Sequence, residues 1–280
     1  MQLDSHQHFW KFDPIRDSWM NSSMKTIQRD FMPEDLKPEL DKVGIDGCIA
    51  VQADQSEDET RFLLEIANAN PWVKKVVGWV EFNSENIEYK LEGYQKEKKL
   101  AGFRLILQAL PPEAMEEKNF LKGISLLEKY GFTYDILIYP KHLNKAYDFA
   151  KKFPNQPFVI DHLAKPDIKN GEFKFWSKGM KAMAALPNVC CKVSGMVTEA
   201  NWYHWKKEQF VPYLDFITEN FGTNRLMFGS DWPVCVLAAS YQEVYEISAN
   251  YFKNFSPNEK AAIFGENSAR FYKVQSESAL

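Results

Sequence analysis

The sequence predicts an α/β fold, a single (β/α)8 barrel of the TIM-barrel type that takes up residues 1–280. Three observations predict it. Eight short runs rich in β-branched and aromatic residues recur along the chain, and a longer amphipathic segment follows each run. The first residues of the runs advance by about 32 residues on average, close to the roughly 30 residues of one βα unit. The length of 280 residues fits one such barrel with additions.

Several of the predicted strands are apolar almost throughout, as in Ile136-Leu137-Ile138 and Phe158-Val159-Ile160. This composition is typical of parallel strands that are buried on both faces. The eight predicted strands are, in order, Gln2–His8, Asp46–Ala53, Val76–Phe82, Gly102–Gln108, Thr133–Tyr139, Pro157–His162, Val189–Ser194 and Arg225–Asp231.

Helix boundary signals lie between the strands. Ser56 and Glu59 have the spacing of a capping box, and Gly44, Gly131 and Gly222 each stand between a helical pattern and the next strand. Strands that alternate with helices in this way favour a closed barrel over an open doubly wound sheet. The first predicted strand is also not followed by the glycine-rich phosphate loop of dinucleotide-binding open sheets.

Two regions depart from the repeat. Phe9–Met32 forms a long first βα loop, which in a barrel lies at the C-terminal face where active sites are built. After the last predicted strand, Ser240–Phe252, Pro257–Phe264 and Asn267–Tyr272 are predicted to form extra C-terminal helices. The sequence indicates no linker and no second domain.

Composition excludes several classes of protein. Hydrophobic residues make up 45% and charged residues 26% of the chain, the balance of a globular domain. The 34 basic and 38 acidic residues give a net charge of −4, which disfavours a nucleic-acid partner. We expect no membrane partner and, because a signal peptide pattern is missing, a cytoplasmic protein. In that compartment Cys48, Cys190, Cys191 and Cys235 should be reduced packing residues.

His6 and His8 are the first candidate site residues. They lie two positions apart at the end of the first predicted strand, so their side chains project to the same side of it. Two imidazoles that converge in this way suit a divalent metal such as zinc. The alternative is a pair of histidines that are hydrogen-bonded in a packed barrel mouth.

Asp231 ends the eighth predicted strand, next to the first strand of a closed barrel. Its carboxylate can therefore bind a metal together with His6 and His8, accept a proton from water, or do both. An N-cap or an Asx turn ahead of Pro233 is the structural alternative. Both interpretations fit Asp231 alone, and the two histidines favour the functional one.

Two further predicted strands carry polar residues. His162 ends the sixth strand beside Asp161 and ahead of Lys165, which indicates a site, although a lone histidine is more often structural. Arg104 interrupts an apolar run, so it either forms an ion pair inside the barrel or faces an oxygen-rich substrate. His142 is predicted at the start of a surface helix, and His204 at the surface or in packing.

Together these segments resemble the amidohydrolase superfamily, in particular its metal-poor lactonase branch. The resemblance covers nearly the whole chain. The segments that carry it are Asp4-Ser5-His6-Gln7-His8-Phe9-Trp10, Val51-Gln52-Ala53 with Glu59-Thr60-Arg61, Gly102-Phe103-Arg104, Asp161-His162-Leu163-Ala164-Lys165-Pro166 and Gly229-Ser230-Asp231-Trp232-Pro233.

The resemblance implies a hydrolase that opens a sugar-acid lactone of the L-fuconolactone or L-rhamnonolactone type. Asp231 would be the general base on water, and His162 would lie near the scissile carbonyl. Arg104 and Lys165 would contact substrate oxygens. Trp232, with Trp10 and Trp19, offers an apolar wall for the sugar ring, although ordinary packing also accounts for tryptophans.

The resemblance also implies a metal site formed by His6, His8 and Asp231. The family's histidine on strand five and its lysine or glutamate on strand four are missing, and Arg104 stands on strand four instead. We therefore expect one divalent metal, zinc by preference, whose removal lowers activity modestly or not at all. A metal-dependent decarboxylase and a catalytically silent ligand-binding barrel are the alternatives. The expected partner is a small-molecule lactone, and a homo-oligomer is compatible with the sequence.

Overall fold

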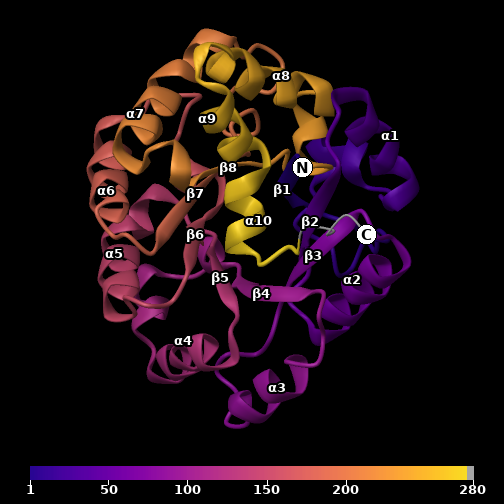
Figure 1. The fold of residues 1–280 in the computed structure, drawn as a ribbon, viewed down its shortest axis with the longest axis vertical. Helices are drawn as coiled ribbons and strands as arrows, with labels where there is room; N and C mark the ends of the chain where they lie inside the picture. The colour runs from indigo at the N-terminus through magenta and orange to yellow at the C-terminus, as the bar shows by residue number, and fades with distance from the viewer. Residues whose placement is uncertain (276–280) are drawn as a thin grey trace.

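The computed structural model describes residues 1–275 and confirms the predicted barrel. Eight parallel strands follow one another around the sheet in the order of the chain, and helices surround them (Figure 1). The strands are β1 (Leu3–Gln7), β2 (Gly47–Val51), β3 (Val73–Gly78), β4 (Leu100–Leu105), β5 (Thr133–Ile136), β6 (Phe158–Ile160), β7 (Val189–Val193) and β8 (Leu226–Phe228). The helices are α1 (Pro33–Val43), α2 (Glu57–Ala69), α3 (Ile87–Tyr94), α4 (Lys118–Tyr130), α5 (Leu143–Lys152), α6 (Lys174–Ala184), α7 (Val211–Phe221), α8 (Tyr241–Tyr251), α9 (Pro257–Ala261) and α10 (Asn267–Phe271).

Backbone hydrogen bonds close the ring where β1 and β8 end. Gln7 and Trp232 form a parallel bridge. The N–H of His8 donates to the carbonyl of Trp232 at 2.7 Å, and the N–H of Asp231 donates to the carbonyl of His6 at 2.8 Å. The seam of the barrel therefore runs through candidate site residues.

Side chains of each strand alternate between the inside of the barrel and the helix layer. On β6, Val159 belongs to a small apolar cluster inside the barrel, whereas its neighbours Phe158 and Ile160 pack in the large core against the helices. On β5, Tyr134 and Ile136 likewise face the helices. The inner cluster consists of Ile49, Val51, Val77, Ala101, Val159, Met227 and Tyr272.

The strands end earlier than the sequence predicted at two places that matter for the site. The predicted strand Pro157–His162 ends at Ile160, and the four residues from His162 to Lys165 all have positive φ, between 51° and 57°. The predicted strand Arg225–Asp231 ends at Phe228, and Asp231 has a φ of 59°. Left-handed backbone is costly for residues other than glycine, and such strain gathers at functional sites. The chain turns out of the sheet here and carries polar side chains across the mouth of the barrel.

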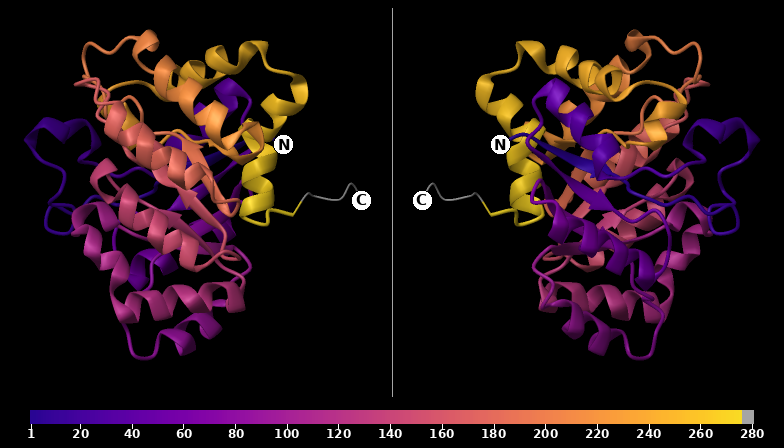
Figure 2. Two further views of the ribbon diagram at one scale, coloured as in Figure 1. Left: turned by 90° about the vertical axis from the view of Figure 1, so that its left-hand side faces the viewer. Right: turned by 90° about the vertical axis from the view of Figure 1, so that its right-hand side faces the viewer.

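The predicted C-terminal helices are confirmed as α8, α9 and α10, with a π-helical turn at Ala262–Glu266 between the last two. Helix α10 lies across one end of the ring of strands (Figures 1 and 2). That end is the N-terminal one, because a Cβ on Gly265 would lie 2.0 Å from the carbonyl oxygen of Met1. Tyr272, directly after α10, enters the inner cluster and is fully buried.

The predicted long first loop is ordered by its own contacts. Trp10 and Phe31 form an antiparallel bridge that ties its two ends together, and a short 3₁₀ helix at Ser22–Ile27 lies between them. All four cysteines are free thiols, as expected. Within residues 1–275, the structure contains no helix with the length and apolar character needed to cross a bilayer.

Candidate active site

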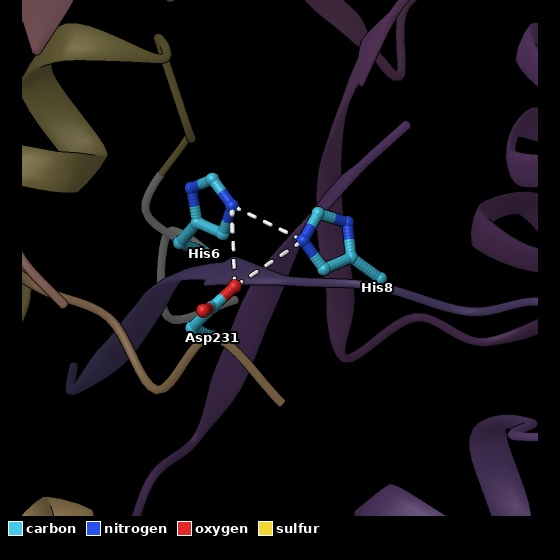
Figure 3. Close-up of side chains that lie close together, drawn as sticks. All are labelled: His6, His8 and Asp231. Carbon is cyan, nitrogen blue, oxygen red and sulfur yellow. Dashed lines mark hydrogen bonds and ion pairs between the residues drawn. The ribbon is translucent and has the colours of Figure 1, made fainter. Parts of the chain in front are cut away.

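His6, His8 and Asp231 converge at the seam of the barrel (Figure 3). His6 Nε2 lies 3.2 Å from His8 Nε2. The Oδ1 atom of Asp231 lies 3.4 Å from His8 Nε2 and 3.9 Å from His6 Nε2. All three residues are at most 5% exposed. The structure thus brings together the two histidines and the carboxylate that the sequence singled out.

The fit of these atoms to a metal ion can be tested from the distances between them. Zinc binds imidazole nitrogen and carboxylate oxygen at about 2.0–2.2 Å, so two ligands at a tetrahedral angle lie about 3.3 Å apart. The 3.2 Å and 3.4 Å separations at His8 Nε2 match that value, and the 3.9 Å separation needs only a wider angle. The three residues fit one divalent ion.

The orientation of His8 leaves its inner nitrogen available. His8 Nδ1 lies 2.7 Å from the carbonyl oxygen of Val51, an acceptor, so Nδ1 carries a proton. Nε2 faces His6 and Asp231. A backbone carbonyl behind a histidine is a common way to fix a metal-ligating imidazole.

Asp231 is an ionised carboxylate in this environment. Burial alone would raise its pKa, but the three neighbouring imidazoles, that of His162 first, outweigh burial and hold the pKa of Asp231 well below its ordinary value. The backbone carbonyl of Asp231, and not its side chain, accepts the N–H of Cys235 in the turn that follows. The side chain faces the imidazoles, so the predicted capping alternative does not describe its position.

His162 also lies beside Asp231 and His6. Its Nε2 is 3.7 Å from Asp231 Oδ1, and its Nδ1 is 2.9 Å from the hydroxyl of Ser194. Burial lowers the pKa of His162 to about 4, although the two nearby aspartates act in the opposite direction. The ring is therefore neutral at physiological pH and can accept a hydrogen bond or a proton.

Arg104 forms an ion pair inside the barrel, one of the two alternatives that the sequence left open. Its guanidinium donates to Asp161 Oδ2 at 3.0 Å and to the backbone carbonyl of Gln52. Its Nη1 atom also lies 3.3 Å from His6 Nε2. Arg104 thus borders the site and is 3% exposed.

Sequence reasoning missed a second charged pair below His6. Lys192 Nζ lies 2.6 Å from Asp135 Oδ2 and 3.0 Å from Asp161 Oδ1, and all three residues are fully buried. Tyr272 donates to the same Asp135 oxygen at 2.8 Å. The signal was present, because Lys192 interrupts an apolar strand in the same way as Arg104.

The other predicted residues lie around this centre. Lys165 Nζ is 3.4 Å from Glu199 Oε1, and both side chains keep some exposure, 17% and 19%. Trp232 is 3% exposed and packs edge-on against Phe9 and Phe31, which is ordinary core packing.

The remaining predicted residues include Trp10, whose ring centroid lies 6.4 Å from that of His8. Trp10 is buried, whereas Trp19 is 45% exposed. His204 is exposed, as expected. His142 lies at the start of a helix, directly before α5, as predicted, but the expected exposure is wrong, because its side chain is fully buried. Its Nε2 pairs with the carbonyl of Leu110 at 3.0 Å, and its Nδ1 pairs with the backbone of Tyr139.

The chain matches the family model described as amidohydrolase over residues 3–274. The chain belongs to the amidohydrolase family. This amidohydrolase is 34% identical over 286 residues to the L-fucono-1,5-lactonase of Burkholderia multivorans, a match that covers 98% of the chain and 96% of the relative. It is also 34% identical over 284 residues to the L-fucono-1,5-lactonase of Burkholderia ambifaria, with 99% and 97% covered. The expected family and the expected hydrolase class are confirmed.

A solved structure resembles this amidohydrolase along its whole length. The crystal structure of an amidohydrolase from Burkholderia multivorans with bound zinc superposes with a TM-score of 0.95 at 33% identity, covering 98% of this chain and 100% of the other. That protein binds zinc within the same fold.

Proposed function

We propose that this amidohydrolase opens the ester ring of a sugar-acid lactone, of the L-fucono-1,5-lactone type. The observation that carries the proposal is the match, over nearly the full chain, to two L-fucono-1,5-lactonases at 34% identity. A buried, ionised carboxylate at the mouth of the barrel gives the chain a group suited to that chemistry.

Asp231 is the proposed general base. A water molecule beside its Oδ1 atom loses a proton to the carboxylate as it attacks the lactone carbonyl. His162, neutral and 3.7 Å from the same oxygen, lies where it can orient the water or the carbonyl. An ester releases an oxygen leaving group, which is far better than the amine of an amide, so one base and fixed charges suffice for the reaction.

Positive side chains are proposed to stabilise the charge that develops on the carbonyl oxygen. Arg104 is anchored by Asp161 and by the carbonyl of Gln52, so it keeps its position without reorganisation during the reaction. Lys165, partly exposed beside Glu199, is the proposed contact to hydroxyl groups of the sugar. Trp232, which packs against Phe9 and Phe31, is proposed to support the apolar surface against which the sugar ring binds.

His6, His8 and Asp231 are the proposed holders of one divalent ion, zinc by preference. The distances among their atoms fit such an ion, and a relative of the same fold at 33% identity binds zinc. When bound, the ion would supply Lewis-acid polarisation of the lactone carbonyl. Arg104, close to the same atoms, acts on the carbonyl in the same sense.

The decarboxylase alternative has no observation in its favour. It calls for a metal-ligating histidine on strand five, where this chain has Asp135. The Oδ2 atom of that carboxylate pairs with Lys192 and Tyr272.

Lactone opening releases a carboxylic acid, so a pH-indicator assay tests the proposal directly. We expect L-fucono-1,5-lactone to be opened fastest in a panel of 1,5- and 1,4-sugar lactones, with the same buffer without protein as the control for uncatalysed hydrolysis. Rates equal to the uncatalysed reaction for every lactone in the panel would overturn the proposal.

A further inference from the structure

Lys165 and Glu199 form an ion pair at the mouth of the barrel. The Nζ atom of Lys165 lies 3.4 Å from Glu199 Oε1, and both side chains keep some contact with solvent. Lys165 ends the left-handed turn that begins at His162, and its backbone N–H donates to the carbonyl of His162 at 2.7 Å. Burial lowers the pKa of Lys165, but Glu199 and then Asp231 outweigh burial and raise that pKa above its ordinary value. The lysine therefore lies within electrostatic reach of the proposed general base.

The position of Glu199 is fixed through its backbone. Its carbonyl accepts the N–H of Lys169 at 3.0 Å, which joins the loop after β7 to the loop after β6. Gly195, at the start of the loop after β7, has a φ of 65°, and a Cβ there would lie 2.7 Å from the ring of His162. The loop that carries Glu199 therefore packs closely against His162 and holds the carboxylate at one edge of the site.

Each of the three cations that border the site has a carboxylate partner. The pairs are Arg104 with Asp161, Lys192 with Asp135, and Lys165 with Glu199. The carboxylate of Asp231 is a fourth negative charge. Three cations and four carboxylates leave a net charge of −1 on these side chains. Apart from the imidazoles, they offer no positive excess to a substrate that carries a carboxylate.

A hollow of about 510 Å³ adjoins Glu199 at the C-terminal face of the barrel. Two carboxylates, an amide, an indole and a single cation stand among the described residues that line it, namely Asp167, Glu199, Asn201, Trp202 and Lys169. Carboxylate oxygens accept hydrogen bonds from hydroxyl groups, whereas they repel another carboxylate. The hollow therefore suits the hydroxyl-bearing part of an uncharged sugar lactone.

We propose that Glu199 is a specificity-determining residue, which neutralises Lys165 and accepts a hydroxyl group of the substrate, so that the site takes uncharged hydroxylated lactones and rejects lactones that carry a carboxylate. The inference rests on the proposed function, which sets Lys165 against the hydroxyl groups of the sugar. A lysine without this partner attracts a carboxylate, because its ammonium group is a compact point charge. Loss of the charge of Glu199 therefore changes the preference of the site and does not merely weaken it.

The test measures the binding of isophthalate, a dicarboxylate with no ester to open, by calorimetry on chelator-treated protein, in which no metal ion captures the probe. Glu199→Gln keeps the size of the side chain and an acceptor oxygen, and it removes the charge. We expect its Kd for isophthalate to be at least about tenfold lower than that of the wild type, because a like charge is removed and Lys165 is left free to pair with the probe.

Two variants serve as controls. Lys165→Met/Glu199→Gln lacks both charges and should show none of the gain. Glu116→Gln breaks an ion pair with Lys145, 2.8 Å apart and away from the imidazoles, and should change Kd less than about twofold. A folded Glu199→Gln variant that binds isophthalate no more tightly than the wild type would overturn the inference. An equal gain in the double variant would overturn it as well, since Lys165 would then not be the group that captures the anion.

Lactone opening should change in the opposite direction. Glu199→Gln is expected to lower kcat/KM for L-fucono-1,5-lactone by about tenfold, mainly through KM, because a charge-assisted hydrogen bond to a substrate hydroxyl is lost. A merely structural role in the loop would weaken both ligands together. Opposite changes for the lactone and for isophthalate therefore separate specificity from support of the fold.

A further measurement needs no variant. The wild type should bind isophthalate with a Kd above about 1 mM, and tighter binding would overturn the inference even if Glu199→Gln failed to fold. Isophthalate binding involves no turnover. Absence of lactone opening by the wild type would therefore contradict the proposed function, whereas a gain in isophthalate binding that is confined to Glu199→Gln would still uphold the role of Glu199.

Discussion

The backbone N–H of Asp231 donates to the backbone carbonyl of His6 at 2.8 Å. The first and the last parts of the barrel are thus joined at the two residues whose side chains meet in the site. Because backbone atoms form this bond, the carboxylate of Asp231 is free for chemistry. A change to that side chain should therefore affect the reaction far more than the fold.

Asp231→Asn is expected to lower kcat by about 10²–10⁴-fold, the range typical of general-base catalysis. The amide keeps the shape of the carboxylate and cannot take a proton from water. The measurement is lactone opening at saturating substrate, with circular dichroism to verify the fold. A variant that keeps nearly normal kcat would show that Asp231 has only a structural role in the turn.

Removal of the metal is expected to lower lactone opening modestly or not at all. Arg104 remains beside His6 when the ion is absent, and an ester needs less activation than an amide. The protein is dialysed against a chelator, elemental analysis establishes that the metal is gone, and the rate is measured. Complete loss of activity that one equivalent of zinc restores would contradict this expectation.

The histidines themselves are expected to matter more than the ion. His6→Ala or His8→Ala removes a group that touches Asp231 in the absence of metal, so each should lower kcat/KM by about 10²-fold or more. The assay uses chelator-treated proteins, so that loss of an ion does not contribute. Equal rates for the chelated wild type and chelated His8→Ala would assign these residues to metal binding alone.

The sequence was sufficient to predict which residues meet at the barrel mouth. Period-two spacing put His6 and His8 on one side of a strand, and closure of the ring put Asp231 beside them. The place of His162 at the site was predicted because it comes at the end of an apolar run. These inferences depend only on the regular geometry of strands and on their order, which the alternation of apolar and amphipathic segments reveals.

The charged layer inside the barrel could not be predicted in the same way. Each of its members, such as Lys192 on β7 and Asp135 on β5, is unfavourable by itself inside an apolar strand. The two strands are separated by β6, so only the closed barrel shows that cation and anion meet at 2.6 Å. Tyr272, which completes the layer, comes from a segment 137 residues away from Asp135. The left-handed turn after β6 was also invisible, because its residues are not glycine.

Arg104→Met is expected to destabilise the protein by about 3 kcal/mol, the lower end of the range for removing one partner of a buried ion pair. Asp161 keeps Lys192 at 3.0 Å, so its charge is not left wholly unpaired. The free energy of unfolding is measured by urea titration. The double variant Arg104→Met/Asp161→Asn should recover most of the loss, since it leaves neither charge alone. A single variant as stable as the wild type would show that the ion pair with Asp161 adds nothing to stability.

Glu59 offers a pH-dependent test away from the imidazoles. It lies in the first turn of α2 and is 6% exposed. Burial raises the pKa of Glu59 to about 7, although the backbone N–H of Ala53 donates to its Oε1 atom at 2.9 Å and favours the charged form. In the unfolded chain the same carboxyl titrates near 4.5. The folded protein therefore holds this proton more tightly than the unfolded chain.

The sign of the effect on stability follows from that difference. Below pH 4.5 Glu59 is protonated in both the folded and the unfolded state, and its contribution to the free energy of unfolding is fully present. Between pH 4.5 and 7 the unfolded chain loses the proton first, so the folded state loses stability as pH rises, by up to about 3 kcal/mol in total.

Glu59→Gln keeps an acceptor for Ala53 and cannot ionise. It should match the wild type at pH 4 and exceed its free energy of unfolding at pH 8, measured by urea titration at both pH values. Glu65→Gln, on the exposed side of the same helix, is the control and should change stability by less than about 0.5 kcal/mol at either pH. A Glu59→Gln variant without any gain between pH 4 and pH 8 would show that the folded protein accommodates the charged carboxylate at no cost.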